Sequence, residues 1–349
     1  MATSNKKISL GLQGGGSYGA FTWGVLDRLL QEERLDIGAI SGTSAGAINA
    51  VLVADGYARG GGRDGARRAL TRFWRGLGAA ALFSPMQRTP LDHLAGGFTM
   101  SHSPFYQLME MAGALAGPVR EMPLTVNPLR EFLSAHVDFA RVRACEELLV
   151  FVNATHVHSG TGVIWSRAEL DVQRVMASCC LPTVFASVEV DGELYWDGSF
   201  TANPPLFPLV EANAAQDLLV VQINPIARSE TPRSMADISN RANEVAFNIS
   251  FVREVNALLH NQAVPDERSG EGICFAPVRL HLISAQDTLK ELSVSSKFNA
   301  ERGFLQLLHE RGVAAADAWL AQHFDDIGLR TSMDPAPVFG NSTRVRSDI

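Results

Sequence analysis

Residues 8–46 read ISLGLQGGGSYGAFTWGVLDRLLQEERLDIGAISGTSAG and contain the strongest structural signal in the chain. Two short apolar runs, 8–12 and 37–41, each pass into a glycine-rich turn. Apolar residues then recur at the spacing of one helix face, first at Phe21, Val25, Leu26, Leu29 and Leu30, and again at Ala47, Ile48, Val51 and Leu52. Two successive strand–turn–helix units predict an α/β fold with a mainly parallel central sheet.

The remaining sequence continues this alternation of strands and helices. Continuous apolar or alternating runs predict further strands at 148–155, 183–190, 193–196, 218–223 and 278–283. Asp191-Gly192 between two of these runs is typical of a β-hairpin turn. Helical patterns cover residues 234–262 and 297–323.

The distribution of these elements predicts one catalytic domain over residues 1–330. Residues 58–128 contain several prolines and weak strand signals, which indicates a helical insertion over the sheet. Residues 234–325 are expected to form a C-terminal helical part of the same domain. Residues 331–349 are expected to be a flexible tail.

Composition narrows the functional classes. The 349 residues are 46% hydrophobic and carry a net charge of −7, so the chain has no basic stripe to displace phosphate counterions, and no nucleic-acid partner is expected. The arginines between residues 59 and 75 predict a solvated helix face. Four cysteines without CxxC spacing predict neither a zinc site nor disulfides. No signal peptide or membrane span is recognisable, which predicts a cytoplasmic protein.

Gly42-Thr43-Ser44-Ala45-Gly46 is a G-x-S-x-G motif between a predicted strand and a predicted helix. A serine on such a sharp turn has a strained backbone, and small neighbours prevent a clash around it. Its hydroxyl would lie at the helix N-terminus, where the helix dipole favours developing negative charge. Ser44 is therefore the candidate nucleophile, with Gly42 and Gly46 supporting the turn.

The earlier loop, Gly14-Gly15-Gly16-Ser17-Tyr18-Gly19, also follows a strand and opens a helix. Its G-x-G-x-x-G spacing formally matches a dinucleotide-binding loop. However, that site needs an acidic residue at the end of the second strand, and here the second strand leads into the Ser44 turn instead. The dense glycine run better suits backbone amides that stabilise an oxyanion.

The base that activates the serine is less obvious from local patterns. Of the nine histidines, His156 and His158 at a strand end are the best candidates for a histidine triad. Asp197-Gly198 lies in a more special context, because it closes a predicted strand and is followed by Asn203-Pro204-Pro205 rather than by a second strand. Turn formation alone explains Asp197 less well than it explains Asp191.

Taken in order, these motifs resemble the patatin-like phospholipase (lipid acyl hydrolase) family, which has a GGGxxG loop, a G-x-S-x-G turn and a later D-G-G or D-G-A. The resemblance covers roughly residues 8–225. It implies a patatin-like α/β/α sandwich, a Ser44–Asp197 dyad without histidine, and an oxyanion hole from Gly14, Gly15 and Gly16. Gly19 and Gly198 would support the motifs, and neither a metal nor an organic cofactor is implied.

Two positions depart from the family pattern. Many relatives carry Arg or Lys where this chain has Ser17-Tyr18, and Ser199 replaces the final Gly or Ala of the late motif. A missing cation beside the glycine loop would weaken recognition of a phospholipid headgroup.

The resulting prediction is a lipid acyl hydrolase that cleaves carboxylic esters of phospholipids or glycerides through an acyl-enzyme. Alternatives are a related acyl-transfer enzyme (a thioesterase, a polyester depolymerase or an acyltransferase) and a non-enzymatic or nucleotide-binding module. The apolar stretch 98–119 would either cap an acyl pocket or touch a membrane surface, or simply pack on the sheet. We therefore expect an acyl-ester or lipid substrate, with peripheral membrane contact as a possibility.

Overall fold

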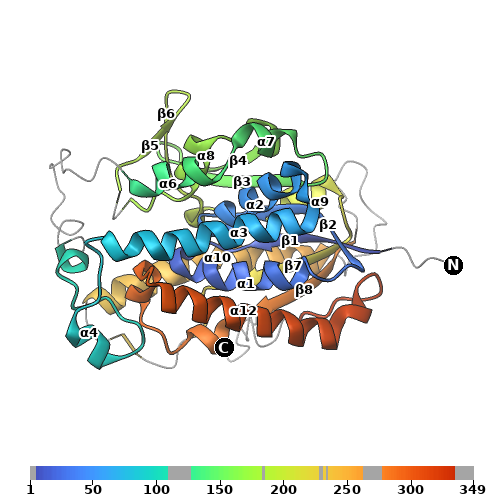
Figure 1. The fold of residues 1–349 in the computed structure, drawn as a ribbon. Helices are drawn as coiled ribbons and strands as arrows, with labels where there is room; N and C mark the ends of the chain where they lie inside the picture. Colours follow the sequence, from blue (N-terminus) through green and yellow to red (C-terminus); the bar gives the residue numbers. More distant parts are fainter. Residues whose placement is uncertain are drawn as a thin grey trace, which may run out of the picture.

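A computed structural model of the chain describes residues 5–108, 127–182, 185–227, 231–232, 235–261 and 277–334. Eight strands form one sheet in the order β5-β6-β3-β2-β1-β7-β8, with β4 paired to β3 (Figure 1). The strands are β1 Lys6–Leu12, β2 Leu35–Gly42, β3 Leu149–His156, β4 Gly162–Ser166, β5 Val188–Val190, β6 Glu193–Asp197, β7 Asp217–Gln222 and β8 Arg279–Ser284.

The five strands β3, β2, β1, β7 and β8 pair parallel to one another. The pairs β3–β4, β3–β6 and β5–β6 are antiparallel. The mainly parallel sheet expected from the sequence is therefore confirmed. The hairpin is shorter than expected, because its first arm begins at Val188, and residues 183–184 lie outside the described part. β4 was not expected from the sequence.

Helices cover both faces of the sheet (Figure 1). In β7, Leu219 and Val221 belong to the core shared with the first helices and the last one, while Leu218 and Val220 belong to the core beneath α10. Burial on both faces explains why this strand is continuously apolar. The main helices are α1 Gly19–Leu29, α2 Ala45–Gly56, α3 Gly62–Ala80, α4 Pro90–Ala95, α6 Pro128–His136, α7 Phe139–Ala144, α8 Val172–Ser178, α9 Phe207–Ala212, α10 Met235–Asn261, α11 Gln286–Leu289 and α12 Arg302–His323.

The arrangement is an α/β/α sandwich, as expected. Within the predicted insertion, α3 packs along α2, and residues 109–126 lie outside the described part. At the start of the predicted tail, the N–H groups of Ser332 and Met333 donate to the Leu280 carbonyl in β8, and residues 335–349 are not described.

One detail of the pairing brings distant segments together. β2 pairs with β3 up to Gly42–Val152, and β6 pairs with β3 from Ala154–Asp197. Because β4 occupies the opposite edge of β3 over this whole region, β2 and β6 must share one edge. Their C-terminal ends therefore meet head to head across a single residue of β3, Asn153.

Candidate active site

Ser44 occupies a strained turn between β2 and α2. Its backbone angles are φ 54° and ψ −120°, in a region that side-chain-bearing residues rarely adopt. The two flanking glycines are required by close approach: a Cβ on Gly46 would collide with the Leu12 carbonyl, and a Cβ on Gly42 would lie 2.5 Å from the Gly46 carbonyl oxygen. Strain of this kind is typical of a functional turn.

The glycine loop lies directly against this serine. A Cβ on Gly14 would come within 2.7 Å of the Ser44 Cβ, so the first glycine is needed for the loop to reach the turn. Gly14 is held on both sides, because its N–H donates to Asn203 Oδ1 (2.7 Å) and its carbonyl accepts from Asn224 Nδ2 (2.6 Å). The Gly14 N–H is consequently already paired within the protein.

The next two glycines differ from Gly14. Among the residues that the structure describes, neither Gly15 N–H nor Gly16 N–H has a hydrogen-bond acceptor, and both residues are more exposed than Gly14. Gly16 has φ 59° and lies against the Lys297 carbonyl. Gly19 lies where a Cβ would meet the Cβ of Ala45 at 2.7 Å, so it lets the start of α1 pack against the start of α2. These two amides, in the loop whose first glycine reaches Ser44, are suited to binding an oxyanion.

Asp197 ends β6 beside the same serine. Its side chain is buried, and burial raises its pKa to about 6, despite opposing hydrogen bonds from Ser199 and from the hydroxyl of Ser44. The Ser199 N–H donates to Asp197 Oδ1 at 2.8 Å. A carboxylate with a pKa raised this far can accept a proton near neutral pH more readily than an ordinary aspartate.

Asn153 holds the Ser44 and Asp197 turns in register. Its Oδ1 accepts from Thr43 Oγ1 (2.6 Å), and its Nδ2 donates to the carbonyls of Gly198 and Ala202, both at 3.0 Å. A Cβ on Gly198 would lie 2.5 Å from the Asn153 carbonyl oxygen, which explains why glycine follows Asp197. This buried amide is a positioning residue that the sequence reasoning missed, because nothing near it marks it as special.

One protein family matches the chain over most of its first two thirds. A sequence model described as "Patatin-like phospholipase" matches residues 10–210, more than half of the chain. The chain belongs to the patatin-like phospholipase family. Membership in the patatin-like phospholipases supports a lipid hydrolase, and the matched region includes both glycine motifs and Asp197.

Solved structures that match the chain include VipD from Legionella pneumophila, at 13% identity and a TM-score of 0.38, covering 91% of this chain and 67% of that one. The heterodimeric ExoU–SpcU complex of the Pseudomonas aeruginosa type III secretion system contains another, at 15% identity and a TM-score of 0.32, covering 91% of this chain and 53% of that one. The chain spans about two thirds of VipD and about half of the ExoU-complex chain. Because these identities and TM-scores are low, the family assignment rests on the sequence match alone. A search of curated proteins found no significant match.

Many patatin-like enzymes carry Arg or Lys where this chain has Ser17-Tyr18, and here the nearby lysine comes from another segment. Tyr18 is buried, and its hydroxyl contacts Ser296 Oγ at 2.8 Å in η6 (Val294–Phe298). From the same segment, Lys297 Nζ lies 5.7 Å from the Tyr18 ring centroid and donates to Asn224 Oδ1 at 3.1 Å. A segment remote in sequence thus brings a lysine beside the glycine loop, where its ammonium also lies 3.8 Å from the buried carboxylate of Glu244.

The neighbours of the Ser44–Asp197 pair include further residues that the sequence did not single out. The Ser44 N–H donates to Ser178 Oγ at 2.9 Å, and the thiol of Cys179 lies close enough to interact with Ser44 and Asp197. Burial, with Asp197 nearby, raises the pKa of Cys179 well above its ordinary value. The thiol therefore stays neutral and adds little charge to the site.

The alternative bases, His156 and His158, contact Glu193 instead of Ser44. His156 Nε2 lies 2.9 Å from Glu193 Oε2, and its Nδ1 lies 2.8 Å from Ser159 Oγ, so both ring nitrogens of His156 already have partners. This arrangement favours Asp197 over a histidine as the base.

Three of the six arginines between residues 59 and 75 form ion pairs, while their side chains stay partly exposed. Arg59 pairs with Asp55 at 3.0 Å, Arg63 with Asp36 at 2.6 Å and Arg67 with Asp27 at 2.7 Å. A surface hollow between α1, α3 and α12 is lined by several of these arginines together with Trp23 and His309. It contains none of the residues around Ser44.

Proposed function

We propose that this patatin-like protein is a serine-dependent lipid acyl hydrolase that cleaves carboxylic ester bonds through a Ser44–Asp197 dyad and an acyl-enzyme. The observation that carries the proposal is the meeting of a strained, half-buried serine with a buried aspartate whose pKa is raised to about 6. The family match supports the lipid hydrolase class.

The proposed chemistry needs one proton acceptor and no cofactor. Asp197 takes the proton of the Ser44 hydroxyl as Oγ bonds to the acyl carbon, and the protonated Asp197 then gives that proton to the departing alcohol. A water molecule next gives a proton to Asp197 and attacks the acyl-enzyme. The fatty acid leaves, and Ser44 recovers its proton from Asp197.

The tetrahedral intermediates of both steps carry a negative oxygen. The N–H groups of Gly15 and Gly16 are the donors that support its stabilisation, while Gly14 N–H is already bonded to Asn203. Each such donor is worth about 3 kcal/mol of transition-state stabilisation.

The direct test is hydrolysis of p-nitrophenyl esters from short to long acyl chains, with the native protein beside Ser44→Ala. The variant should lose at least about 10³-fold in kcat/KM and should no longer react with a fluorophosphonate. Ser166→Ala, a serine change on β4 away from the site, is the matched control. Equal activity in Ser44→Ala and the native protein would overturn the proposal.

The preferred acyl acceptor, water or an alcohol, distinguishes a hydrolase from an acyltransferase. With an added long-chain alcohol, a hydrolase releases mainly free fatty acid, whereas an acyltransferase forms the new ester in preference. A maximum with thioesters or short-chain esters would favour a thioesterase or polyester depolymerase instead.

The protein also has an apolar surface suited to peripheral contact with a lipid surface. The side chains involved lie at the end of α3, on α4 and just beyond; they are Leu82, Phe83, Leu91, Leu94 and Leu108. Phe83 is 91% exposed and Leu94 is 85% exposed. Large apolar side chains that are exposed over one stretch of the chain often mark interaction sites.

The segment that follows α4 is connected to the glycine loop through η6. Met100 N–H donates to Ser295 Oγ at 2.9 Å, and the neighbouring Ser296 holds Tyr18 of the loop. In Figure 1, α4 lies at the side of the molecule opposite the N-terminus, the side toward which β1 runs. Of the predicted stretch 98–119, Phe98 stacks on Phe304 in the core, and residues from 109 onward lie outside the described part.

Replacing Phe83 and Leu94 together by serine should lower hydrolysis of phospholipid in vesicles by at least about tenfold. Hydrolysis of a soluble short-chain ester should stay unchanged, because the Ser44 site is intact. Ile164→Ser, on exposed β4, is the control. A parallel loss on both substrates would argue against a role in lipid contact. Among the described helices, none has the length and apolar character needed to cross a bilayer.

A further inference from the structure

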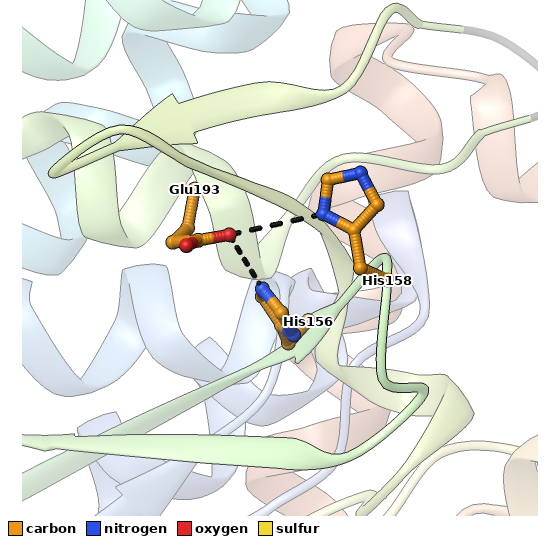
Figure 2. A group of neighbouring side chains, drawn as sticks. All are labelled: His156, His158 and Glu193. Carbon is orange, nitrogen blue, oxygen red and sulfur yellow. Dashed lines mark hydrogen bonds and ion pairs between the residues drawn. The ribbon is translucent and has the colours of Figure 1, made fainter.

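Three potential metal ligands converge beside the turn end of the β5–β6 hairpin. His156 is the last residue of β3, His158 follows two residues later, and Glu193 is the first residue of β6. Figure 2 shows the Glu193 carboxylate between the two imidazole rings. His156 Nε2 lies 2.9 Å and His158 Nδ1 3.7 Å from the same oxygen, Glu193 Oε2. The three ligand atoms all lie within 4.8 Å of one another.

A second contact prepares His156 for metal binding. Its Nδ1 lies 2.8 Å from Ser159 Oγ, and that hydroxyl lies 2.7 Å from Thr161 Oγ1. The Ser159 N–H lies 3.3 Å from Nδ1 and donates to it when Nδ1 is unprotonated. In the other tautomer, Nδ1–H donates to the Ser159 hydroxyl, and this form leaves the Nε2 lone pair for a metal. Metal-binding histidines generally have their second ring nitrogen bonded in this way.

A simple ion pair explains this group less well. Exposed His–Glu pairs contribute little to stability, and one histidine is sufficient to make one. Here two histidines from one chain segment approach a single carboxylate from another. The His158 side chain is 69% exposed and the Glu193 side chain 55%, so an ion can reach them from solvent.

We propose that His156, His158 and Glu193 bind one divalent transition-metal ion of the zinc class, with the fourth position open to water. Two imidazoles and one carboxylate are a ligand set that zinc accepts in tetrahedral sites with an open position. The ion would tie the end of β3 to the start of β6, the strand whose other end carries Asp197. Because the ion would bind only to the native state, it would stabilise the fold.

The test is titration of zinc into chelator-treated, full-length protein, followed by calorimetry and thermal unfolding. One equivalent should bind and raise Tm by several degrees. Cobalt(II) in place of zinc should give the visible absorption of a four-coordinate site. His158→Ala and Glu193→Gln should each weaken zinc binding by at least about tenfold, as should Ser159→Ala to a smaller extent. His93→Ala, which changes an exposed histidine on α4, should bind zinc as the native protein does.

Circular dichroism of the metal-free variants establishes that they are folded. The proposal fails if the native protein binds no zinc, or if His158→Ala and Glu193→Gln bind it as tightly as the native protein. Ser44→Ala should bind zinc normally, so this result is independent of whether the proposed hydrolase activity is correct.

Discussion

The two ends of β6 carry carboxylates with opposite properties. Asp197, its last residue, pairs with Ala154 inside the sheet, and burial raises its pKa to about 6. Glu193, its first residue, adjoins the hairpin turn, and His156 lowers its pKa. The two residues belong to one short strand, yet desolvation dominates at one end and charge pairing at the other. Environment, rather than residue type, therefore decides which carboxylate can act as a base.

The largest expected difference is in activity. Asp197→Asn should lower kcat/KM by about 10²–10⁴-fold, because an amide cannot accept the Ser44 proton. The measurement is ester hydrolysis at pH 7.5. Asp191→Asn, in the turn of the same hairpin, is the control, since its φ of 52° is one that asparagine also adopts. Comparable losses of activity in both variants would show that burial of Asp197 does not give it a special role.

The next difference is in the pH dependence of stability. The pKa of Asp197 is raised on folding, so its contribution is fully present below the unfolded pKa and is lost as pH rises through about 6. Asp197→Asn should therefore gain stability relative to the native protein between pH 4 and pH 8, by up to about 3 kcal/mol. Urea unfolding of the variant and the native protein at both pH values measures this change in their relative free energy of unfolding.

Glu193 should behave in the opposite sense. Its pKa is lowered, so its contribution is present above the unfolded pKa and is lost as pH falls through the folded one. Glu193→Gln should lose a little stability at neutral pH and none at low pH. The same sign of pH dependence in the Asp197 and Glu193 variants would contradict the comparison.

The raised pKa of Asp197 should also appear in catalysis. Below pH 6, kcat/KM for a neutral ester should fall by about tenfold per pH unit, because protonated Asp197 cannot act as a base. A profile measured from pH 4.5 to 8 checks this. An acid limb near the ordinary pKa of aspartate, with no inflection near 6, would show that burial does not tune the group.

The smallest effect concerns the final position of the late motif. The Ser199 side chain is one of the hydrogen-bonding groups that lower the pKa of Asp197, so Ser199→Ala should shift the acid limb slightly to higher pH without abolishing activity. Ser187→Ala removes the hydroxyl just before β5 that accepts a hydrogen bond from Trp196 Nε1, and it should leave the limb in place. A shift to lower pH in Ser199→Ala would be inconsistent with that role.

Sequence reasoning was most successful where the signal was local. The bounds of the strands before the glycine loop and before the Ser44 turn were predicted to within a few residues. Apolar periodicity and small residues at tight turns are patterns among neighbouring residues, which a sequence shows directly. β4 was missed, since five residues after a loop give too short a pattern. Asn153 was missed as well, because its role depends on two strand ends that meet across it.

The sequence by itself determined the α/β fold, the order of the motifs and the choice of Ser44 and Asp197 as candidates. Only the tertiary structure decided that Asp197 is buried and that Gly14 N–H is already bonded to Asn203. It also decided that Lys297 reaches the glycine loop and that Glu193 lies between His156 and His158. The physical reason is that local propensity acts between near neighbours, whereas desolvation, strand register and ligand convergence arise between segments that meet only in the folded chain.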